Sequence, residues 1–409
     1  MDFNSTLEEE ANSTTIPITT IDGTTTFFIV LNFIVGIIGL AGNTAVCTTV
    51  LRSKFLHDIT HYLIASLAMS DFLCCFFFLI TTMFVAEGHP FPVNISSGFW
   101  GEVYCRFFWN LHLFWSAFFA SVFNLVVVTF DRYLAIVHPF FYARVFTVRR
   151  GLMLAASAWV FAFILELEFP IRSHYSDEAN DCDFLGLGPA WFAKMLFIKS
   201  FTVSFILPLI FLIWAYYKII RTLRKGELYQ KTHRTSQRIR QGNGQSNGEF
   251  TDEQGNWQNT EQGNEQKTEQ GNGQNTEQGN GQNTEQGNGQ NTEQANEHAN
   301  EQRGMEVYKA TRRVVQSLII ISALFVVLLL PSEMGNVLLL YDISIDFTGS
   351  HIGNIFRITT VCNSVVNPMI YAIKYKRFRR AMKATMCPCM KTTVEREDTT
   401  FTVDMDEQA

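Results

Sequence analysis

Charged residues are nearly absent from several long stretches of this sequence, although they make up 17% of its 409 residues. No Asp, Glu, Lys or Arg occurs from Phe107 to Phe130, for example. A helix needs roughly 20 mostly apolar residues to cross a bilayer core of about 30 Å, and soluble proteins rarely contain such a stretch. We predict an all-α membrane protein, a seven-transmembrane helix bundle with spans at about 27–51, 60–86, 103–131, 150–170, 194–218, 314–340 and 352–373.

Lysine and arginine are nearly missing from alternate connections between these spans. Residues 1–26, 87–102 and 341–351 contain neither and 171–190 contains only Arg172, whereas basic residues gather in the other connections and, after the last span, in KYKRFRRAMK. Because basic loops stay on the cytoplasmic side, we expect an extracellular N-terminus and a multi-pass protein of the plasma membrane. The chain also lacks a basic segment at its start, so the first span is expected to insert as its own signal.

Cysteine is scarce on the outer side, where only Cys105 and Cys182 of the eight cysteines fall. Disulfides persist outside the cell, so these two are expected to tie the start of the third span to the loop before the fifth. On the inner side, Cys387 and Cys389 follow the last basic stretch and are candidates for palmitoylation.

Apolar residues are almost missing from residues 226–305, where TEQGNGQN recurs every eight residues. Such a composition cannot form a core, so we expect a disordered cytoplasmic loop. This loop separates the first five transmembrane helices, which lie within residues 27–225, from the sixth and seventh, which lie within residues 306–373. The remaining parts are an extracellular N-terminus over 1–26 and an amphipathic helix with a cytoplasmic tail over 374–409. Three outer sequons are expected to carry glycans, at Asn4, Asn12 and Asn94.

Polar residues inside the spans are few, and each is a functional candidate because its burial in lipid is costly. Asp71 lies deep in the second span and has no basic partner in that span. Ser121 lies in the third span, and Asn363 and Ser364 lie in the seventh. Their oxygen atoms could ligate a small cation such as sodium or order a water network. The alternative is a polar packing cluster without an ion.

An acid and a base, Asp131 and Arg132, stand side by side before Tyr133 where the third apolar stretch ends. This triplet resembles the signature of rhodopsin-like (class A) G protein-coupled receptors. The resemblance extends through every span and leaves out only the N-terminus, the long insert and the distal tail. The other motifs are GNTAV (Gly42, Asn43), LAMSD (Leu67, Ala68, Asp71), Trp159, Pro208 with Tyr216, Phe325 with Pro331, and NSVVNPMIY (Asn363, Ser364, Asn367, Pro368, Tyr371).

The resemblance implies a receptor rather than an enzyme, which passes an extracellular signal to a heterotrimeric G protein. Arg132 would be held by Asp131 at rest and would contact Tyr216 and the G protein after activation. The cluster around Asp71 matches the family's allosteric sodium pocket, and no other cofactor is expected. Arrestin, a receptor kinase and membrane lipid are further expected partners, and nucleic acid is not. The switch residues carried over are Asp131, Arg132, Tyr133, Tyr216, Phe325, Pro331, Asn367, Pro368 and Tyr371.

Several features of the family are missing. Leu329 replaces the toggle tryptophan of the sixth helix, and Thr311 replaces the acid that faces Arg132 in many members. We therefore expect appreciable basal activity. Cys105 lies 27 residues before Arg132, two more than usual, and two residues turn a straight helix by about 200°. The extra length implies either an irregular helix start or an adjusted disulfide.

The third helix also lacks the aspartate with which amine receptors bind an ammonium group. Counting back from Arg132 places Phe114 at that position, and counting forward from Cys105 places His112 there. Since neither residue is acidic, a monoamine ligand is disfavoured. The seventh span has no lysine that could hold retinal, so a light receptor is disfavoured as well.

Charges of both signs lie in the outer half of the spans. Glu166 is expected to face inward, and Glu168 to reach toward the headgroups. Glu333 and Arg357 either bind a charged ligand or pair with each other. Together with the acidic loop at 177–183, both signs of charge favour a peptide, as in a neuropeptide receptor, with a non-peptide small molecule as the alternative. The candidate ligand contacts are Glu333, Arg357, His112, Phe114, Glu166 and Lys199.

Two other classes of protein fit less well. HDITH places His57 and His61 one helical turn apart, a metal-ligand spacing, but the motif lacks the catalytic glutamate of zinc proteases. A transporter would show repeated halves and charges at mid-membrane on several helices. Only Asp71 lies that deep, so a transporter is disfavoured.

Overall fold

A computed structural model of the protein describes residues 23–85, 97–186, 189–226, 305, 308–309, 311–335, 337–338, 341 and 350–386. The chain divides into two compact units, Met1–Ala215 with Ser317–Ala409, and Tyr216–Gln316. In the second unit, the Tyr308 hydroxyl donates to the carbonyl of Leu223 at 3.2 Å. The predicted modification sites Asn4, Asn12, Asn94, Cys387 and Cys389 and the repeat-containing loop lie outside the described residues and stay predictions.

Six of the described helical segments are long and apolar enough to cross a membrane. They are α1 (Gly23–Arg52), α2 (Ile59–Phe84), α4 (His112–Val137), Val148–Arg172, Lys194–Gly226 and Thr311–Gly335. The seventh predicted span is α11 (His351–Lys374). Its 24 residues reach about 36 Å, but its buried face carries Arg357, Asn363, Ser364 and Asn367, so its composition is less apolar than that of the other six.

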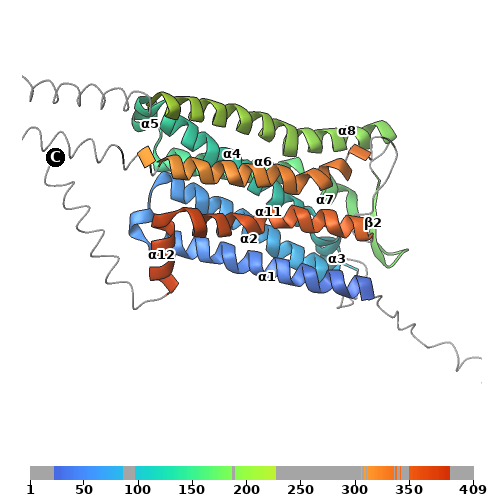
Figure 1. The fold of residues 1–409 in the computed structure, drawn as a ribbon. Helices are drawn as coiled ribbons and strands as arrows, with labels where there is room; N and C mark the ends of the chain where they lie inside the picture. The colour runs from blue at the N-terminus through green and yellow to red at the C-terminus, as the bar shows by residue number, and fades with distance from the viewer. Residues whose placement is uncertain are drawn as a thin grey trace, which may run out of the picture. The chain divides into compact units, whose positions relative to one another are not determined.

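The helices of the first unit pack around α2 and α4. Helix α2 contacts α1, α4 and α11, and α6 (Val148–Leu165) packs against α4 and α2, as Figure 1 shows. One hydrogen-bonded bridge joins three of them. Trp159 Nε1 donates to Ser66 Oγ at 3.2 Å, and Ser66 Oγ donates to Asn124 Oδ1 at 2.8 Å. Large apolar side chains on the outside of the same helices, such as Ile164, remain exposed, which suits contact with hydrocarbon rather than water.

Close packing between α1, α2 and α11 depends on a glycine. A Cβ atom on Gly39 would lie 2.3 Å from Cys75 Sγ and 3.1 Å from Val365 Cγ2, so a larger residue cannot fit without movement. One turn further along, Asn43 Nδ2 donates to the backbone oxygens of Gly39 and Ser364, both at 3.0 Å. This side chain therefore links α1 to α11.

The third span begins irregularly. Helix α3 (Phe99–Tyr104) runs into a π-helical turn at Cys105–Trp109, and Leu111 has a left-handed backbone with φ 62° before α4 starts at His112. The Cys105–Cys182 disulfide is present, with a Cα–Cα distance of 5.3 Å that lies in the usual range. Of the two alternatives raised by the extra residues, the irregular helix start is confirmed.

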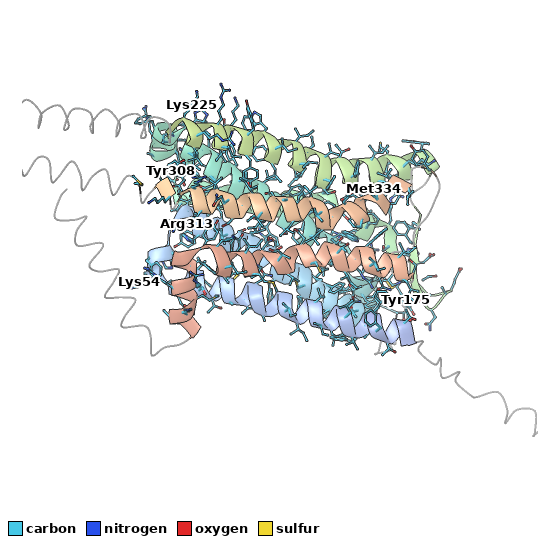
Figure 2. All side chains as sticks on the ribbon, in the orientation of Figure 1. Lys54, Tyr175, Lys225, Tyr308, Arg313 and Met334 are labelled. Atoms are coloured by element: carbon cyan, nitrogen blue, oxygen red, sulfur yellow. A yellow bond between two sulfur atoms is a disulfide. The ribbon has the colours of Figure 1, made fainter. Side chains whose placement is uncertain are left out.

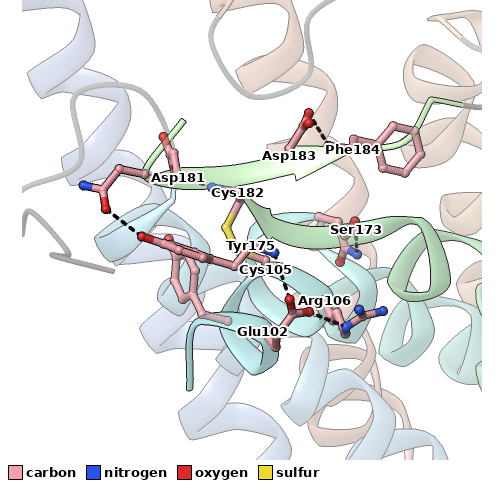
Figure 3. The surroundings of a disulfide bond; sticks show 12 residues. Glu102, Cys105, Arg106, Ser173, Tyr175, Asp181, Cys182, Asp183 and Phe184 are labelled. Carbon is pink, nitrogen blue, oxygen red and sulfur yellow. Dashed lines mark hydrogen bonds and ion pairs between the residues drawn. A yellow bond between two sulfur atoms is a disulfide. The ribbon is translucent and has the colours of Figure 1, made fainter. Parts of the chain in front are cut away.

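An outer hairpin follows the fourth span. Helix α7 (Glu168–Arg172) leads into the antiparallel strands β1 (Ser173–Ser176) and β2 (Asp181–Phe184), with Tyr175 opposite Cys182. Figure 3 shows how the hairpin is fixed to α3 beside the disulfide. Glu102 pairs with Arg106 at 2.8 Å and accepts the backbone N–H of Tyr175 at 3.3 Å. Figure 2 places Tyr175 at the opposite end of the first unit from Lys54, in line with the predicted outer and inner sides.

Short elements complete the described fold. On the inner side, α5 (Pro139–Val145) follows α4, and a 3-10 turn (Lys54–Leu56) precedes α2. Helix α8 (Ala190–Phe201) continues through a π-helical turn at Thr202–Ile206 into the rest of the fifth span. Helix α12 (Lys376–Met386) turns away from the end of α11 (Figure 1) and buries Phe378 and Ala381. The predicted amphipathic helix after the seventh span is therefore confirmed.

Candidate functional site

A cavity of about 190 Å³ opens within the outer half of the first unit. It lies among side chains from the third to the sixth spans, and its lining combines seven apolar residues, five of them aromatic, with four neutral polar and four charged residues. This composition is typical of ligand pockets. The lining residues are Trp115, Phe118, Phe119, Phe169, Phe197, Leu196 and Leu329, the polar Asn110, Ser200, Ser204 and Ser332, and the charged Glu166, Glu168, Lys199 and Glu333.

The four charged lining residues comprise three acids and one base. Lys199 pairs with the carboxylate of Glu168, and its Nζ also donates to the backbone oxygen of Leu165 at 2.9 Å. Across the cavity, Ser204 Oγ donates to Glu333 Oε1 at 2.9 Å. The cavity therefore has an excess of negative charge in a largely apolar surrounding.

The end of the fourth span determines how two of these acids point. Helix α6 ends at Leu165, Glu166 is its C-cap, and a new short helix begins at Glu168. Glu166 faces inward as expected, since it is only 4% exposed and lines the cavity. The expectation that Glu168 reaches toward the headgroups is wrong, because the chain turns after Leu165 and a straight-helix projection no longer applies.

Two of the other predicted ligand contacts lie behind the cavity wall. His112 is buried with its Nδ1 3.1 Å from the backbone oxygen of Glu166, and Phe114 packs against Phe78. Neither is among the lining residues. Because α4 is continuous from His112 to Val137, the count from Arg132 runs through unbroken helix, and the correspondence of Phe114 to the amine-binding aspartate stays a prediction.

Arg357 is buried in α11 outside the cavity lining. Its Nη2 donates to Asn354 Oδ1 at 2.5 Å, and its guanidinium lies 5.9 Å from the centre of the Phe78 ring. A cation over an aromatic face at this distance is stabilised by the ring quadrupole. The two alternatives for Glu333 and Arg357, ligand binding or mutual pairing, both stay predictions.

Sequence reasoning missed the neutral part of the cavity lining. Asn110 follows the π-helical turn, and its side chain donates to Ser173 Oγ at 2.9 Å. Ser200 and Ser204 lie one turn apart on the fifth span. Their spacing of four residues in an apolar stretch is the one signal that could have indicated a shared inward face. The aromatic lining residues carry no such signal, because aromatic residues occur throughout the spans.

The second cluster surrounds Asp71 in the middle of α2. Ser121 Oγ donates to Asp71 Oδ1 at 2.5 Å, and Asn367 Nδ2 donates to Asp71 Oδ2 at 2.8 Å. Asn363 and Ser364 are buried in α11. Ser364 also acts on the Asp71 carboxylate, and the oxygen atoms of these residues fit a small hard cation. Asp71 could supply the negative charge.

The third cluster lies at the inner end of α4. The fully buried Asp131 carboxylate accepts from Arg132 Nε at 2.9 Å and Nη2 at 2.6 Å, and from Thr60 Oγ at 2.8 Å. Tyr142 of α5 donates to the other oxygen, Oδ1, at 2.8 Å. Burial and the nearby charge and hydrogen bond of Asp131 raise the pKa of Tyr142 to about 12. Arg132 is thus held in the manner that the family resemblance implies for the resting state.

The remaining switch residues are distributed along the helices. Tyr133 packs on Trp214 with 4.7 Å between ring centres. Phe325 is buried against Phe205, and Tyr371 packs against Phe378. Pro331 lies in the sixth span and Pro368 inside α11. Tyr216 belongs to the second unit, so its contact with Arg132 stays a prediction.

Comparison with known proteins identifies the family. The family model "7 transmembrane receptor (rhodopsin family)" matches residues 42–371. Cholecystokinin receptor type A of Homo sapiens is 26% identical over 377 residues, which are 88% of this chain and 80% of that receptor. The receptor of the same name from Canis lupus familiaris is 25% identical over 376 residues, again 88% and 80%. Dopamine receptor 2 of Drosophila melanogaster is 34% identical over 185 residues, 44% of this chain and 32% of that receptor. Because the family model covers most of the chain, this protein belongs to the rhodopsin family of seven-transmembrane receptors, which are G protein-coupled receptors and not enzymes.

Proposed function

We propose that the protein is a plasma-membrane receptor for an extracellular peptide. The observation that carries the proposal is the continuity between the cavity and the outer hairpin. Asn110 lines the cavity and donates to Ser173 of β1, and Phe169 lines the cavity and stacks on Phe184 of β2 with 6.4 Å between ring centres. A ligand anchored in the cavity would therefore meet the hairpin on its way out.

The sizes of these features favour a peptide over a small molecule. A cavity of about 190 Å³ admits a few side chains rather than a whole peptide. The rest of a peptide can lie along the hairpin, whose two strands offer backbone groups to which an extended chain can bind. The exposed turn and strand residues of the hairpin include Asp177, Glu178, Asp181 and Asp183, which add polar contacts outside the cavity.

The relatives point in the same direction. The two receptors named for the peptide cholecystokinin match 88% of the chain, whereas the dopamine receptor matches 44%. Phe114, which is buried, stands where an amine receptor would carry its aspartate. The low identity of all three leaves the identity of the peptide open to experiment.

The third cluster, around Asp131 and Arg132 at the inner end of α4, would carry the signal to a heterotrimeric G protein. In the resting state, Arg132 pairs with Asp131 and donates to the Thr60 hydroxyl. A ligand that binds the active arrangement more tightly shifts the population toward it, and Arg132 would then contact Tyr216 and the G protein. Arrestin, a receptor kinase and inner-leaflet lipid at α12 are proposed as further partners.

The proposal is tested in cells that express the tagged chain together with a panel of G protein reporters, treated with a neuropeptide library. We expect a peptide to raise reporter output. Arg132→Ala should reduce that output strongly at equal surface expression, while the affinity for the peptide changes little. Full output from Arg132→Ala would contradict the proposed transduction route. Activation by small amines alone would instead favour a non-peptide receptor.

A further inference from the structure

We infer that the ligand presents a cationic group, an ammonium or a guanidinium, to the carboxylate of Glu166. The inference rests on the proposed function, because it concerns the ligand of the same cavity. It assigns the chemical class of the ligand from this chain's own residues. In this protein the acid that binds the cation would be Glu166, at the end of the fourth span, and not an aspartate of the third helix.

Glu166 is held in position by the backbone around it. As C-cap of α6 it lies where the helix stops, and its backbone oxygen accepts the N–H of Phe169 at 3.3 Å and lies 3.1 Å from His112 Nδ1. The side chain is 96% shielded from solvent, since it is only 4% exposed, yet it lines the cavity. Within the described ranges, its carboxylate has no hydrogen-bond or ion-pair partner. The side chain therefore faces the cavity, near the charges of Lys199 and Glu168.

Among the described residues that line this cavity, Lys199 is the one base, and it is already paired. Lys199 pairs with Glu168 and donates to the backbone oxygen of Leu165, so its charge is balanced without Glu166. A buried carboxylate without a partner is costly. A cationic group on the ligand would offset the free-energy cost of burying this carboxylate. A neutral ligand would leave that cost unchanged, and an anionic ligand would increase it.

The surrounding walls suit an organic cation. Trp115, Phe118 and Phe119 line the same cavity, and aromatic faces attract ammonium and guanidinium groups. Asn110 and Ser200 offer further polar atoms at the wall. A basic side chain with an apolar stem, such as that of arginine or lysine, or the N-terminal amine of a peptide, matches this mixture.

The outer hairpin would steer the same class of ligand. Four acids are exposed on it, at Asp177, Glu178, Asp181 and Asp183. The nearby bases are held: Arg106 by Glu102, and Arg172 by the backbone oxygen of Gly186 and the ring of Phe192. An acidic rim over an apolar cavity raises the local concentration of cations.

The inference is tested on the purified full-length protein with two small probes, Nα-benzoyl-arginine amide and its neutral counterpart Nα-benzoyl-citrulline amide. Binding is followed as the shift of the thermal unfolding midpoint against probe concentration. A hydrogen bond between charged partners is worth about 1.5–3 kcal/mol, so the arginine probe should bind at least about tenfold more tightly than the citrulline probe. Glu166→Gln should remove this preference, whereas Glu166→Asp should weaken but keep it.

The control is Asp58→Asn, which makes the same acid-to-amide change at the exposed N-cap of α2 on the inner side. Asparagine caps a helix as well as aspartate does, so the preference for arginine should remain unchanged. Equal binding of both probes, no binding up to millimolar concentration, or a preference that survives in Glu166→Gln would each overturn the inference. A chain that binds the arginine probe through Glu166 but stays silent toward every G protein reporter would overturn the proposed function and leave the cation site standing.

Discussion

Replacing Tyr142 by phenylalanine should raise the ligand-free activity of the receptor. The Tyr142 hydroxyl is the one described side chain that donates to Asp131 Oδ1, whereas Oδ2 is bonded by Arg132 and Thr60. Without that hydrogen bond, the buried Asp131 carboxylate is less strongly fixed in its position. Arg132, which depends on Asp131 in the resting arrangement, is then released more easily.

The size of the effect follows from the hydrogen bond that is lost. Removing one donor to a charged, buried acceptor costs about 1.5–3 kcal/mol. If the active state is populated to about 1% at rest, this shift raises it to between about 10% and 60%. The change is therefore large enough to appear in basal signalling without any ligand.

The assay is ligand-free G protein activation in cells, normalised to surface expression. Phe141→Leu serves as control, because Phe141 is the preceding residue of α5 and its side chain is exposed. Thr60→Val should act in the same direction by removing a donor to Oδ2. Unchanged basal output in Tyr142→Phe would show that the bond to Asp131 does not restrain Arg132.

The pH dependence of this contact has a definite sign. The pKa of Tyr142 is raised to about 12, above the ordinary value of about 10. Its stabilising contribution is therefore complete below about pH 10 and is lost as the pH rises through about 12. Basal activity measured between about pH 6 and 9 should show no transition from this group, and a Tyr142-dependent step in that window would contradict the assigned hydrogen bond.

Three further predictions concern packing, the disulfide and the ion site. Gly39→Ala should lower the free energy of unfolding by about 1–3 kcal/mol, and adding Cys75→Ala should restore part of the loss, as measured by thermal unfolding in detergent; no rescue would contradict the contact between the two positions. Cys105→Ser should cost about 2–5 kcal/mol and reduce surface expression, and Cys182→Ser should match it, with the double variant no worse than either alone. Asp71→Asn should abolish any rise of the unfolding midpoint in NaCl relative to KCl, and an equal midpoint of the unchanged protein in both salts would argue for a cluster without an ion.

Much of the fold could be predicted because lipid imposes strict composition. Charge-poor stretches located the spans, and the orientation expected from the distribution of basic residues stays a prediction. The family expected from Asp131, Arg132 and Tyr133 is confirmed by the match over residues 42–371. Cys105 and Cys182 form the expected disulfide, since no other pair of cysteines was expected outside.

The rest could not be predicted because it depends on where helices stop. Glu168 was misplaced because nothing in its neighbourhood marks the end of α6 at Leu165. The pairing of Lys199 with Glu168 and the contact of Asn110 with Ser173 join residues far apart in the sequence. Neither contact follows from spacing or composition, yet Glu168, Lys199 and Asn110 all line the cavity.

The left-handed residue Leu111 has a consequence for how this family tolerates changes in length. The two additional residues before α4 are taken up between Cys105 and His112, so the disulfide keeps an ordinary span while α4 keeps its phase relative to Arg132. Insertions and deletions in this segment can therefore move the outer vestibule without rotating the transducing helix. An alignment with other family members that matches Cys105 would shift every inward-facing residue of α4 by two positions. An alignment that matches Arg132 would not. For protein engineering, a change of length within the π-helical turn at Cys105–Trp109 would leave the phase of α4 at its signalling end unchanged.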